Sequence, residues 1–442
     1  MTKTVIIGTN HAGIAAANTL LDNYSDQEVV MIDKNTNLSY LGCGTALWVG
    51  RQIDSYENLF YTNKEAFEEK GAKIYMGTTV ESIDFTKKIV HCENAEGIFD
   101  ENYDKLILAT GSKLISPNIP GKDLKNVEFL KLFQDGQAVD KAIGQSDVKN
   151  VAVIGAGYIG VEIAEAAKRR GKNVLLFDAA ERCLPNYYDT WFTQDMDRVL
   201  GENGIELHYN ELAKEYLGQE KVEAIVTDKG EYPVDLVINA IGFVPNNNLG
   251  KAHLDLFNNG AYLVDLHQQT SDPDVYAVGD CSTVYSNALE ETTYIALATN
   301  AVRSGIVAGH NIGGTPLESI GVQGSNGISI FGYHMVSTGL TVQATEKAGF
   351  NVKYTEFEDL QKPGFMKENN KVKIRIVYEE SSRRILGAQM ASYEDISMGI
   401  HMFSLAIEEK VTIDKLKLLD IFFLPHFNQP YNYITMAALS AD

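Results

Sequence analysis

Cysteine is scarce in this chain: its 442 residues include four, Cys43, Cys92, Cys183 and Cys281. No two of them stand in a C-x-x-C or C-x-x-x-x-C spacing, so the sequence predicts neither a disulfide framework nor a cysteine metal site, and no metal is expected. Any cysteine chemistry is therefore expected to use a single thiol.

Positive charge is also in short supply. The chain has 38 Lys and Arg against 59 Asp and Glu, which gives a formal net charge of −21. Proteins that bind nucleic acid need a cationic footprint, so nucleic acid is not expected as a partner. An anionic cofactor would have to be held by backbone amides and local geometry.

Long apolar runs are absent as well. No stretch approaches the roughly 20 consecutive apolar residues that a membrane span requires. Residues 1–8 enter a strand-like pattern at once, without the basic and apolar regions of a signal peptide. We therefore expect no membrane association and a cytoplasmic location. A hydrophobic content of 45% is ordinary for a globular protein, and the length predicts two or three domains.

What the sequence does contain is an internal duplication. Residues 4–13, TVIIGTNHAG, correspond in pattern to residues 151–160, VAVIGAGYIG. Each is an apolar run, a glycine-rich turn and a helical pattern, followed by a second strand that ends in an acid, Asp33 or Asp178. The duplication predicts two βαβ dinucleotide-binding units.

The rest of the chain extends this pattern. Strand-like segments that end near glycines occur at 105–112, 235–242 and 274–280, whereas alternating strands at 372–378 and 385–390 precede an amphipathic helix at 396–409. The predicted fold class is α/β, with two Rossmann-like dinucleotide-binding domains and a C-terminal α+β domain from about residue 321.

The second glycine turn matches the G-x-G-x-x-G pattern in full, with Gly155, Gly157 and Gly160. Asp178 follows 18 residues after the last glycine, where a carboxylate accepts hydrogen bonds from ribose hydroxyls and repels a 2′-phosphate. The pattern favours NADH over NADPH. The alternative is a glycine turn without a ligand.

The first turn departs from the pattern, because Asn10 replaces the second glycine between Gly8 and Gly13. Asp33 nevertheless follows 20 residues after Gly13. Two dinucleotide folds in one chain imply two dinucleotides, and the ordinary pairing is a flavin with a nicotinamide.

Two residues are candidates for chemistry. Cys43 lies between Gly42 and Gly44, which leave its sulfur accessible and free the local amides to stabilise a thiolate; the alternative is a small core residue. His11 lies in the first turn, where a helix N-terminus would depress its proton affinity and let it exchange protons near neutral pH; the alternative is a structural histidine. The other three cysteines are expected to be structural.

Together these residues resemble the flavin-dependent pyridine nucleotide–disulfide oxidoreductases of glutathione-reductase type, and among them the water-forming NADH oxidases. The resemblance covers essentially the whole chain, and it is carried by residues 7–13, 39–44, 151–160, 276–280, 294–298, 321–327 and 422–427. It implies an FAD-binding domain at 1–113 and 244–320, an NADH-binding domain at 114–243 and a dimerisation domain at 321–442.

The resemblance also implies site residues. Cys43 would cycle between thiolate and sulfenic acid, and His11 would handle protons. FAD would be bound by Gly8, Asn10, His11, Ala12, Asp33, Cys43, Val80, Ala109, Thr110, Gly111, Ser112, Lys131, Asp280, Ala296, Leu297 and Ala298. NADH would be bound by Ile159, Asp178, Tyr187, Gly242 and Gly327. Residues 422–426 would reach the flavin of a second subunit, which implies a homodimer.

The expected function is therefore that of an FAD-dependent NADH oxidase, which reduces dioxygen to water through Cys43. An NADH peroxidase or a coenzyme A disulfide reductase of the same fold is the alternative, because both also use one cysteine in this place. A non-catalytic NADH-binding redox sensor is a further possibility.

Overall fold

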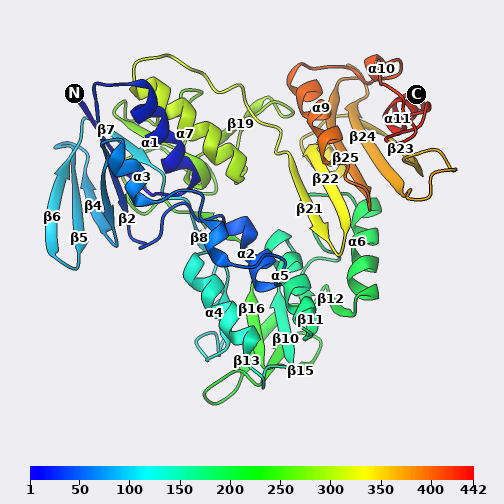
Figure 1. Cartoon of the computed structure of the whole chain (residues 1–442), viewed down its shortest axis with the longest axis horizontal. Coiled ribbons are helices and arrows are strands. Elements are labelled where there is room, and N and C mark those ends of the chain that lie inside the picture. The colour runs from blue at the N-terminus through cyan, green and yellow to red at the C-terminus, as the bar shows by residue number, and fades with distance from the viewer.

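The structure is a computed structural model that describes all residues, 1–442. Its chain forms three units, seen in Figure 1 as an N-terminal unit on the left, a second unit at the bottom and a C-terminal unit on the right. No helix is both long and apolar enough to cross a membrane.

The first unit is built on a sheet of five parallel strands. Their order is β18 (Val275–Ala277), β7 (Lys105–Leu108), β1 (Thr2–Ile7), β2 (Gln27–Asp33) and β3 (Lys73–Met76). Helices α1 (His11–Asn23) and α7 (Ala298–Ile312) pack together, and an antiparallel sheet of β4 (Thr79–Asp84), β5 (Ile89–Asn94) and β6 (Gly97–Asn102) lies at the edge of the unit. Because β18 comes from far along the chain, the chain leaves this unit and returns to complete its sheet.

The second unit repeats the parallel design. Its strands are ordered β12 (Ile205–Tyr209), β11 (Asn173–Asp178), β10 (Asn150–Ile154), β16 (Leu236–Asn239) and β9 (Val127–Phe129). The unit also contains the helices α4 (Phe133–Gly144), α5 (Tyr158–Arg169) and α6 (Thr190–Glu202). A small antiparallel sheet is formed by β13 (Ala213–Leu217), β14 (Ala224–Thr227) and β15 (Glu231–Pro233). Strands β8 (Ser112–Leu114) and β17 (Phe243–Pro245) pair with each other where the chain enters and leaves this unit.

The third unit is an antiparallel sheet covered by helices. The strand order is β21 (Asn326–Ile330), β22 (Tyr333–Gly339), β25 (Ile385–Ser392), β24 (Lys371–Glu379) and β23 (Val352–Leu360). The helices are α8 (Val342–Lys347), α9 (Ser397–Glu408), α10 (Ile413–Leu416) and α11 (Tyr433–Leu439), and the short strands β19 (Val284–Ser286) and β20 (Glu291–Thr293) precede the unit.

The predicted fold class is confirmed, with two parallel α/β units and a C-terminal α+β unit. The central strands of the second parallel sheet are mostly apolar, as expected for strands covered on both faces: β10 and β16 are almost entirely buried. The domain boundaries at residues 113, 243 and 320 remain predictions.

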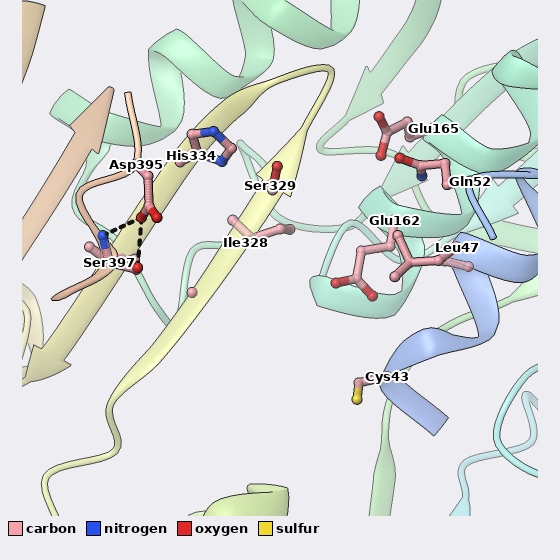
Figure 2. A pocket seen from close by; sticks show the side chains of 13 residues that line it. Cys43, Leu47, Gln52, Glu162, Glu165, Ile328, Ser329, His334, Asp395 and Ser397 are labelled. Carbon is pink, nitrogen blue, oxygen red and sulfur yellow. Dashed lines mark hydrogen bonds between the residues drawn. The ribbon is translucent and has the colours of Figure 1, made fainter. Parts of the chain in front are cut away.

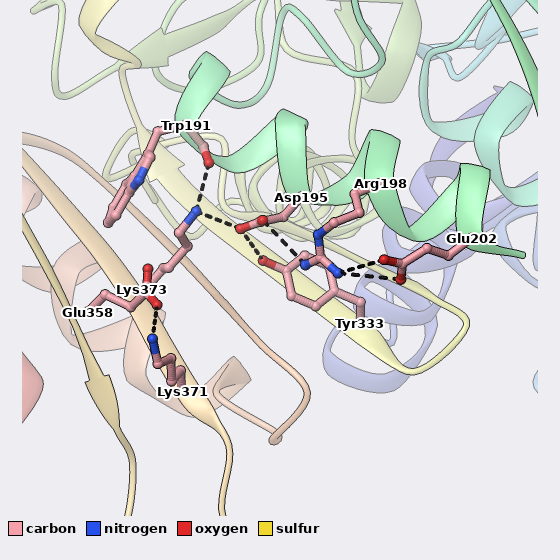
Figure 3. A network of polar contacts seen from close by, with 8 residues as sticks. All are labelled: Trp191, Asp195, Arg198, Glu202, Tyr333, Glu358, Lys371 and Lys373. Atoms are coloured by element: carbon pink, nitrogen blue, oxygen red, sulfur yellow. Dashed lines mark hydrogen bonds and ion pairs between the residues drawn. The ribbon is translucent and has the colours of Figure 1, made fainter.

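Polar contacts join the second and third units along α6 (Figure 3). Lys373 of β24 donates from Nζ to Asp195 Oδ2 at 2.5 Å and to the Trp191 carbonyl oxygen at 3.0 Å. Tyr333 of β22 donates to the same Asp195 oxygen at 3.2 Å. Strands of the third unit thus contact a helix of the second unit through polar side chains.

Candidate active site

The two glycine turns have the same construction. Gly8 and Gly155 have φ angles of +111° and +102°. Asp33 Oδ2 accepts a hydrogen bond from the amide after Gly8 at 2.8 Å, and Asp178 Oδ2 accepts one from Ala156 N, after Gly155, at 2.5 Å. The acid at the end of the second strand therefore closes both turns, which confirms the duplication.

Both turns lead into helices with free N-termini. Neither Asn10, before α1, nor Gly157, before α5, caps its helix with a side chain. A Cβ atom built on Gly157 would meet no atom of the chain within 4 Å. Unpaired amides beside open space fit the pyrophosphate of a dinucleotide.

A polar cluster lies between the first two units. Lys131, which follows β9, donates from Nζ to Ser112 Oγ at 2.7 Å, and Ser112 Oγ donates to Asp280 Oδ2 at 2.9 Å. Burial lowers the pKa of Lys131, and the charge of Asp280 opposes this effect. The structure thus brings together three predicted FAD residues from distant parts of the sequence, and their donors and acceptors fit a polyhydroxyl chain.

The remaining predicted FAD residues surround these features. Ala109 lies beside Gly8, since its carbonyl oxygen is 2.2 Å from a Cβ built there, and Ala12 lies in the first turn of α1. Thr110 donates from Oγ1 to the Asn246 carbonyl oxygen at 2.7 Å. Val80 lies on β4 and packs partly against the core of the first sheet. Gly111 precedes β8, and Ala296, Leu297 and Ala298 lead into α7, whose N-terminus also has no side-chain cap.

Cys43 lies in a 3-10 turn, Gly42–Gly44, directly before the short helix α2 (Thr45–Val49). It is exposed, whereas the other three cysteines are buried. Its sulfur lines a cavity of about 300 Å³ between α2, α5 and strands β21 and β22. Figure 2 shows Cys43 and Glu162 on one wall, with Ile328 and His334 on the other.

The electrostatics of Cys43 differ from the sequence prediction of a stabilised thiolate. The amides of Cys43 and Gly44 do lower the pKa of the thiol, as predicted, but partial removal of the sulfur from water and the charge of Glu162 raise it by more. Burial, together with nearby Glu165, in turn raises the pKa of Glu162 to about 7. Sequence reasoning missed Glu162, although an acid in the helix directly after a nucleotide turn was a usable signal.

His11 is the first residue of α1. Burial lowers the pKa of its imidazole, and the charge of Asp280 opposes this effect. Its Nδ1 lies 3.0 Å from the hydroxyl of Tyr61, and the two rings stack with an interplanar angle of 8°. Sequence reasoning missed Tyr61, because no local pattern relates it to a histidine 50 residues away.

The predicted NADH residues lie around α5. Ile159 is in its first turn, and Asp178 closes the turn before it. Tyr187 packs edge-on against Tyr158 with ring centroids 4.6 Å apart. Gly327 lines the same cavity as Cys43, and Gly242 follows β16 with a φ angle of +99°. Ile159 and Asp178 thus lie at the second glycine turn, and Gly327 lies in the cavity of Cys43.

Two dinucleotide-binding units that share one accessible thiol define an oxidoreductase of the class that uses two dinucleotides. The chain belongs to the pyridine nucleotide-disulphide oxidoreductase family: residues 2–305 match the model of that family, and residues 327–432 match its dimerisation domain.

Among curated relatives, an NADH oxidase of Lactococcus lactis subsp. cremoris is 63% identical over 99% of this chain and its own full length. Among solved structures, a water-forming NADH oxidase from Lactobacillus brevis bound to NADH has a TM-score of 0.96 at 36% identity and covers 100% of this chain and 98% of its own. An engineered water-forming NADPH oxidase bound to NADPH, a mutant of that enzyme with five substitutions, has a TM-score of 0.96 at 35% identity, over 99% of this chain and 98% of its own.

Proposed function

We propose that this protein is an FAD-dependent NADH oxidase that reduces dioxygen to water, with Cys43 as the thiol that cleaves the O–O bond. The observation that carries the proposal is the position of Cys43: it is the one exposed thiol, it lines a cavity against the NADH-binding helix, and no second cysteine is near enough to form a disulfide. The names of the relatives, which share almost the full length of the chain, support the same activity.

The two proposed cofactor sites have different roles, one for FAD and one for NADH. Bound FAD would accept hydride from NADH and supply electrons to dioxygen. In the first unit, the free amides of α1 would bind the FAD pyrophosphate, Asp33 would bind its adenosine ribose, and Ser112 and Asp280 would bind its ribityl chain. In the second unit, Asp178 would accept hydrogen bonds from the ribose of NADH.

Cys43 would carry the second half of the reduction. The thiolate attacks one oxygen of hydrogen peroxide, so that an S–O bond forms, the O–O bond breaks and hydroxide leaves. His11 gives a proton to the hydroxide, which becomes water. A hydride equivalent from a second NADH then reduces the sulfenic acid to thiolate and water. The complete cycle uses two NADH and two protons per dioxygen and forms two water molecules.

The preference for NADH is supported by the engineered relative. Its substitutions replace a glycine and, 18, 19, 20 and 25 residues later, an aspartate, an alanine, a methionine and a proline. This chain has a glycine, an aspartate, two alanines and a proline at the same spacings, at Gly160, Asp178, Ala179, Ala180 and Pro185. Since the engineered protein is bound to NADPH, the matched positions favour Asp178 as the residue that excludes the 2′-phosphate.

We further propose that the protein acts as a homodimer. The segment between α10 and α11 exposes large apolar side chains: Leu418, Phe422, Phe423, Leu424, Phe427 and Tyr431. Phe422 is 67% exposed and Tyr431 is 76% exposed, and a cluster of this kind on a monomer marks a protein interface. The match of residues 327–432 to a dimerisation domain supports a second copy as the partner.

The decisive experiment offers dioxygen, hydrogen peroxide and coenzyme A disulfide separately to the NADH-reduced enzyme. We expect fast NADH oxidation with dioxygen, two NADH consumed per dioxygen, and little oxygen released when catalase is added at the end. Preferred use of peroxide or of the disulfide would assign the protein to one of the alternative activities. Absence of turnover with all three would favour a redox sensor.

Replacement of the thiol tests its role. In Cys43→Ser, oxygen uptake is expected to continue while peroxide accumulates, because a hydroxyl is a far weaker nucleophile toward peroxide, and the consumption should fall from two toward one NADH per dioxygen. Cys92→Ala, which removes a buried cysteine on β5, is the matched control and should keep the value of two. A Cys43→Ser enzyme that still makes water would contradict the proposal.

A further inference from the structure

Tyr61 contacts His11 through both a hydrogen bond and ring stacking. Its hydroxyl lies 3.0 Å from His11 Nδ1, and the two rings stack almost in parallel with centroids 5.7 Å apart. A stacked ring that is also hydrogen-bonded cannot rotate without losing both contacts. The orientation of His11 in the structure therefore depends on Tyr61.

The segment that carries Tyr61 is fixed against the nucleotide turn. Ser39 N donates to the Thr9 carbonyl oxygen at 3.2 Å, and Ser39 Oγ both donates to the Thr62 carbonyl oxygen at 2.7 Å and accepts from Thr62 N at 3.1 Å. Leu41 N donates to the Leu59 carbonyl oxygen at 2.8 Å. The residues just before Cys43 thus join the turn that bears His11 to the segment that bears Tyr61, so the three side chains share one framework.

The surroundings favour one direction of the hydrogen bond between His11 and Tyr61. Tyr61 lines an open cavity of about 540 Å³ with Glu57, Phe60, Thr62 and Asn63, and its hydroxyl has no other partner in the chain. Water in that cavity can accept the phenolic proton, which leaves the phenolic oxygen free to accept from Nδ1–H. Burial raises the pKa of Tyr61 to about 12, so the phenol keeps its own proton at neutral pH.

We propose that Tyr61 is a positioning residue for His11: its oxygen accepts Nδ1–H, so that Nε2 is the nitrogen that exchanges protons with the reacting centre. This inference rests on the proposed function, in which His11 protonates the hydroxide that leaves Cys43. The proton on Nε2 of the imidazolium passes to that hydroxide and forms water, His11 stays neutral with Nδ1–H bonded to Tyr61, and Nε2 regains a proton from solvent.

The proposed hydrogen bond predicts the direction in which Tyr61 shifts the pKa of His11, and this direction can be measured. Burial lowers the pKa of His11. A hydrogen bond accepted from Nδ1–H is stronger when the imidazole is charged, so the proposed hydrogen bond to Tyr61 is expected to act in the opposite direction and raise that pKa. Asp280 is the other group whose charge acts on His11, also in the raising direction, and no like charge opposes it. Loss of the Tyr61 hydroxyl is therefore expected to lower the pKa of His11.

The test is Tyr61→Phe in the FAD-loaded enzyme labelled with ¹⁵N-histidine, with His11→Gln used to assign the His11 signals among the nine histidines. In the wild type, NMR should find the neutral ring protonated on Nδ1. In Tyr61→Phe, the Nε2–H form should gain population, and the pKa of His11 should fall by about half to one unit. A pKa that rises or does not move, or a wild-type ring protonated on Nε2, would overturn the proposal.

Steady-state kinetics supply a second readout. In Tyr61→Phe, we expect kcat at neutral pH to fall about three- to tenfold, its pH profile to move to lower pH by the same amount as the pKa of His11, and KM for NADH to stay unchanged. Tyr56→Phe is the matched control, because Tyr56 lies in the turn Tyr56–Leu59 and its hydroxyl makes no hydrogen bond in the structure. A kcat profile that keeps its pH dependence while the NMR pKa shifts would overturn the link to the reaction.

The two proposals fail in distinguishable ways. If the enzyme does not reduce dioxygen, the proposed function fails, whereas the tautomer and pKa of His11 are still measured without turnover. If the enzyme makes water but His11 behaves alike with and without the Tyr61 hydroxyl, only the role of Tyr61 fails.

Discussion

Glu162 couples α5, the helix proposed to bind NADH, to the Cys43 thiol. It lies on α5 and lines the cavity with Cys43, and its negative charge is one of the two causes that raise the pKa of the thiol. Its own pKa is raised to about 7, so it gains charge as the pH rises through neutrality. The thiolate is therefore disfavoured most in the pH range in which Glu162 is ionised.

This coupling predicts a pH effect. Glu162→Gln keeps the shape but removes the charge, so the pKa of Cys43 should fall, and the midpoint pH for alkylation of Cys43 by iodoacetamide should fall with it. The measurement is the alkylation rate against pH, read by peptide mass. Glu69→Gln, which removes an exposed charge on the helix Lys64–Glu69, should leave the midpoint in place. A midpoint that rises in Glu162→Gln would contradict the electrostatic account.

Asp178 is predicted to determine the preference for NADH over NADPH. Asp178→Ala removes the carboxylate that repels a 2′-phosphate, so the ratio of kcat/KM for NADH over NADPH should shrink by about 5- to 150-fold, which corresponds to about 1–3 kcal/mol. Asp178→Asn separates charge from shape, since it keeps one acceptor oxygen and loses the charge. Steady-state assays with both cofactors decide, and equal use of NADH and NADPH by the wild type would refute the assignment.

The residues of the site differ in how far the sequence can predict them. Gly157, Asp178 and Cys43 stand in short patterns whose meaning is local, so the sequence places them. Tyr61 and Glu162 do not, because each becomes relevant only when the chain folds a distant segment against it. The thiolate stabilisation expected at Cys43 was incomplete for the same reason: the amides are local, whereas the burial and the opposing charge are not.

At the scale of elements, two glycines of the second glycine turn have different roles, one in folding and one in binding. Gly155 has a φ of +102°, and a Cβ there would lie 2.5 Å from the Ala240 carbonyl oxygen. Gly157 has a φ of −75°, and a Cβ there would meet nothing. Gly155 is therefore required by the fold, whereas Gly157 is expected to leave room for a bound ligand.

This contrast gives a matched pair of variants. Gly155→Ala should unfold at a clearly lower temperature, because the backbone strain and the clash together cost about 1–3 kcal/mol. Gly157→Ala should keep the wild-type Tm while its Kd for NADH rises about tenfold or more, which needs only about 1.4 kcal/mol. Thermal unfolding and NADH titration measure both, and a wild-type Kd in Gly157→Ala would show that NADH does not lie over this turn.

The elements themselves were largely predictable. The runs before each glycine turn are apolar because helices cover both parallel sheets, and the structure has the expected strands β1, β2, β10 and β11. The predicted helix at 396–409 is α9, Ser397–Glu408. The contacts between units were not predictable, since they join residues such as Asp195 and Lys373 that lie 178 positions apart.

At the scale of the whole molecule, the exposed segment between α10 and α11 predicts a dimer. Sedimentation at assay concentration should give twice the chain mass of 48.8 kDa. Phe422→Glu should shift the enzyme toward monomer and reduce its activity in proportion, because a charge cannot be buried in an apolar interface without a partner. Lys367→Glu, an exposed charge change in the same unit, is the control. A fully active monomer would refute the dimer as the working form.

The burial of three of the four thiols affects how the enzyme is inactivated by oxidation. In the proposed reaction, peroxide forms inside the enzyme at every turnover. Burial keeps the thiols of Cys92, Cys183 and Cys281 protonated and inaccessible to it. Oxidation by peroxide is therefore expected to be concentrated on Cys43, the sulfur that the proposed cycle reduces again. If Cys43 follows the proposed cycle, irreversible oxidation occurs when a second peroxide reaches its sulfenic acid before the next NADH does. Inactivation should therefore be faster when NADH is depleted than during turnover at high NADH.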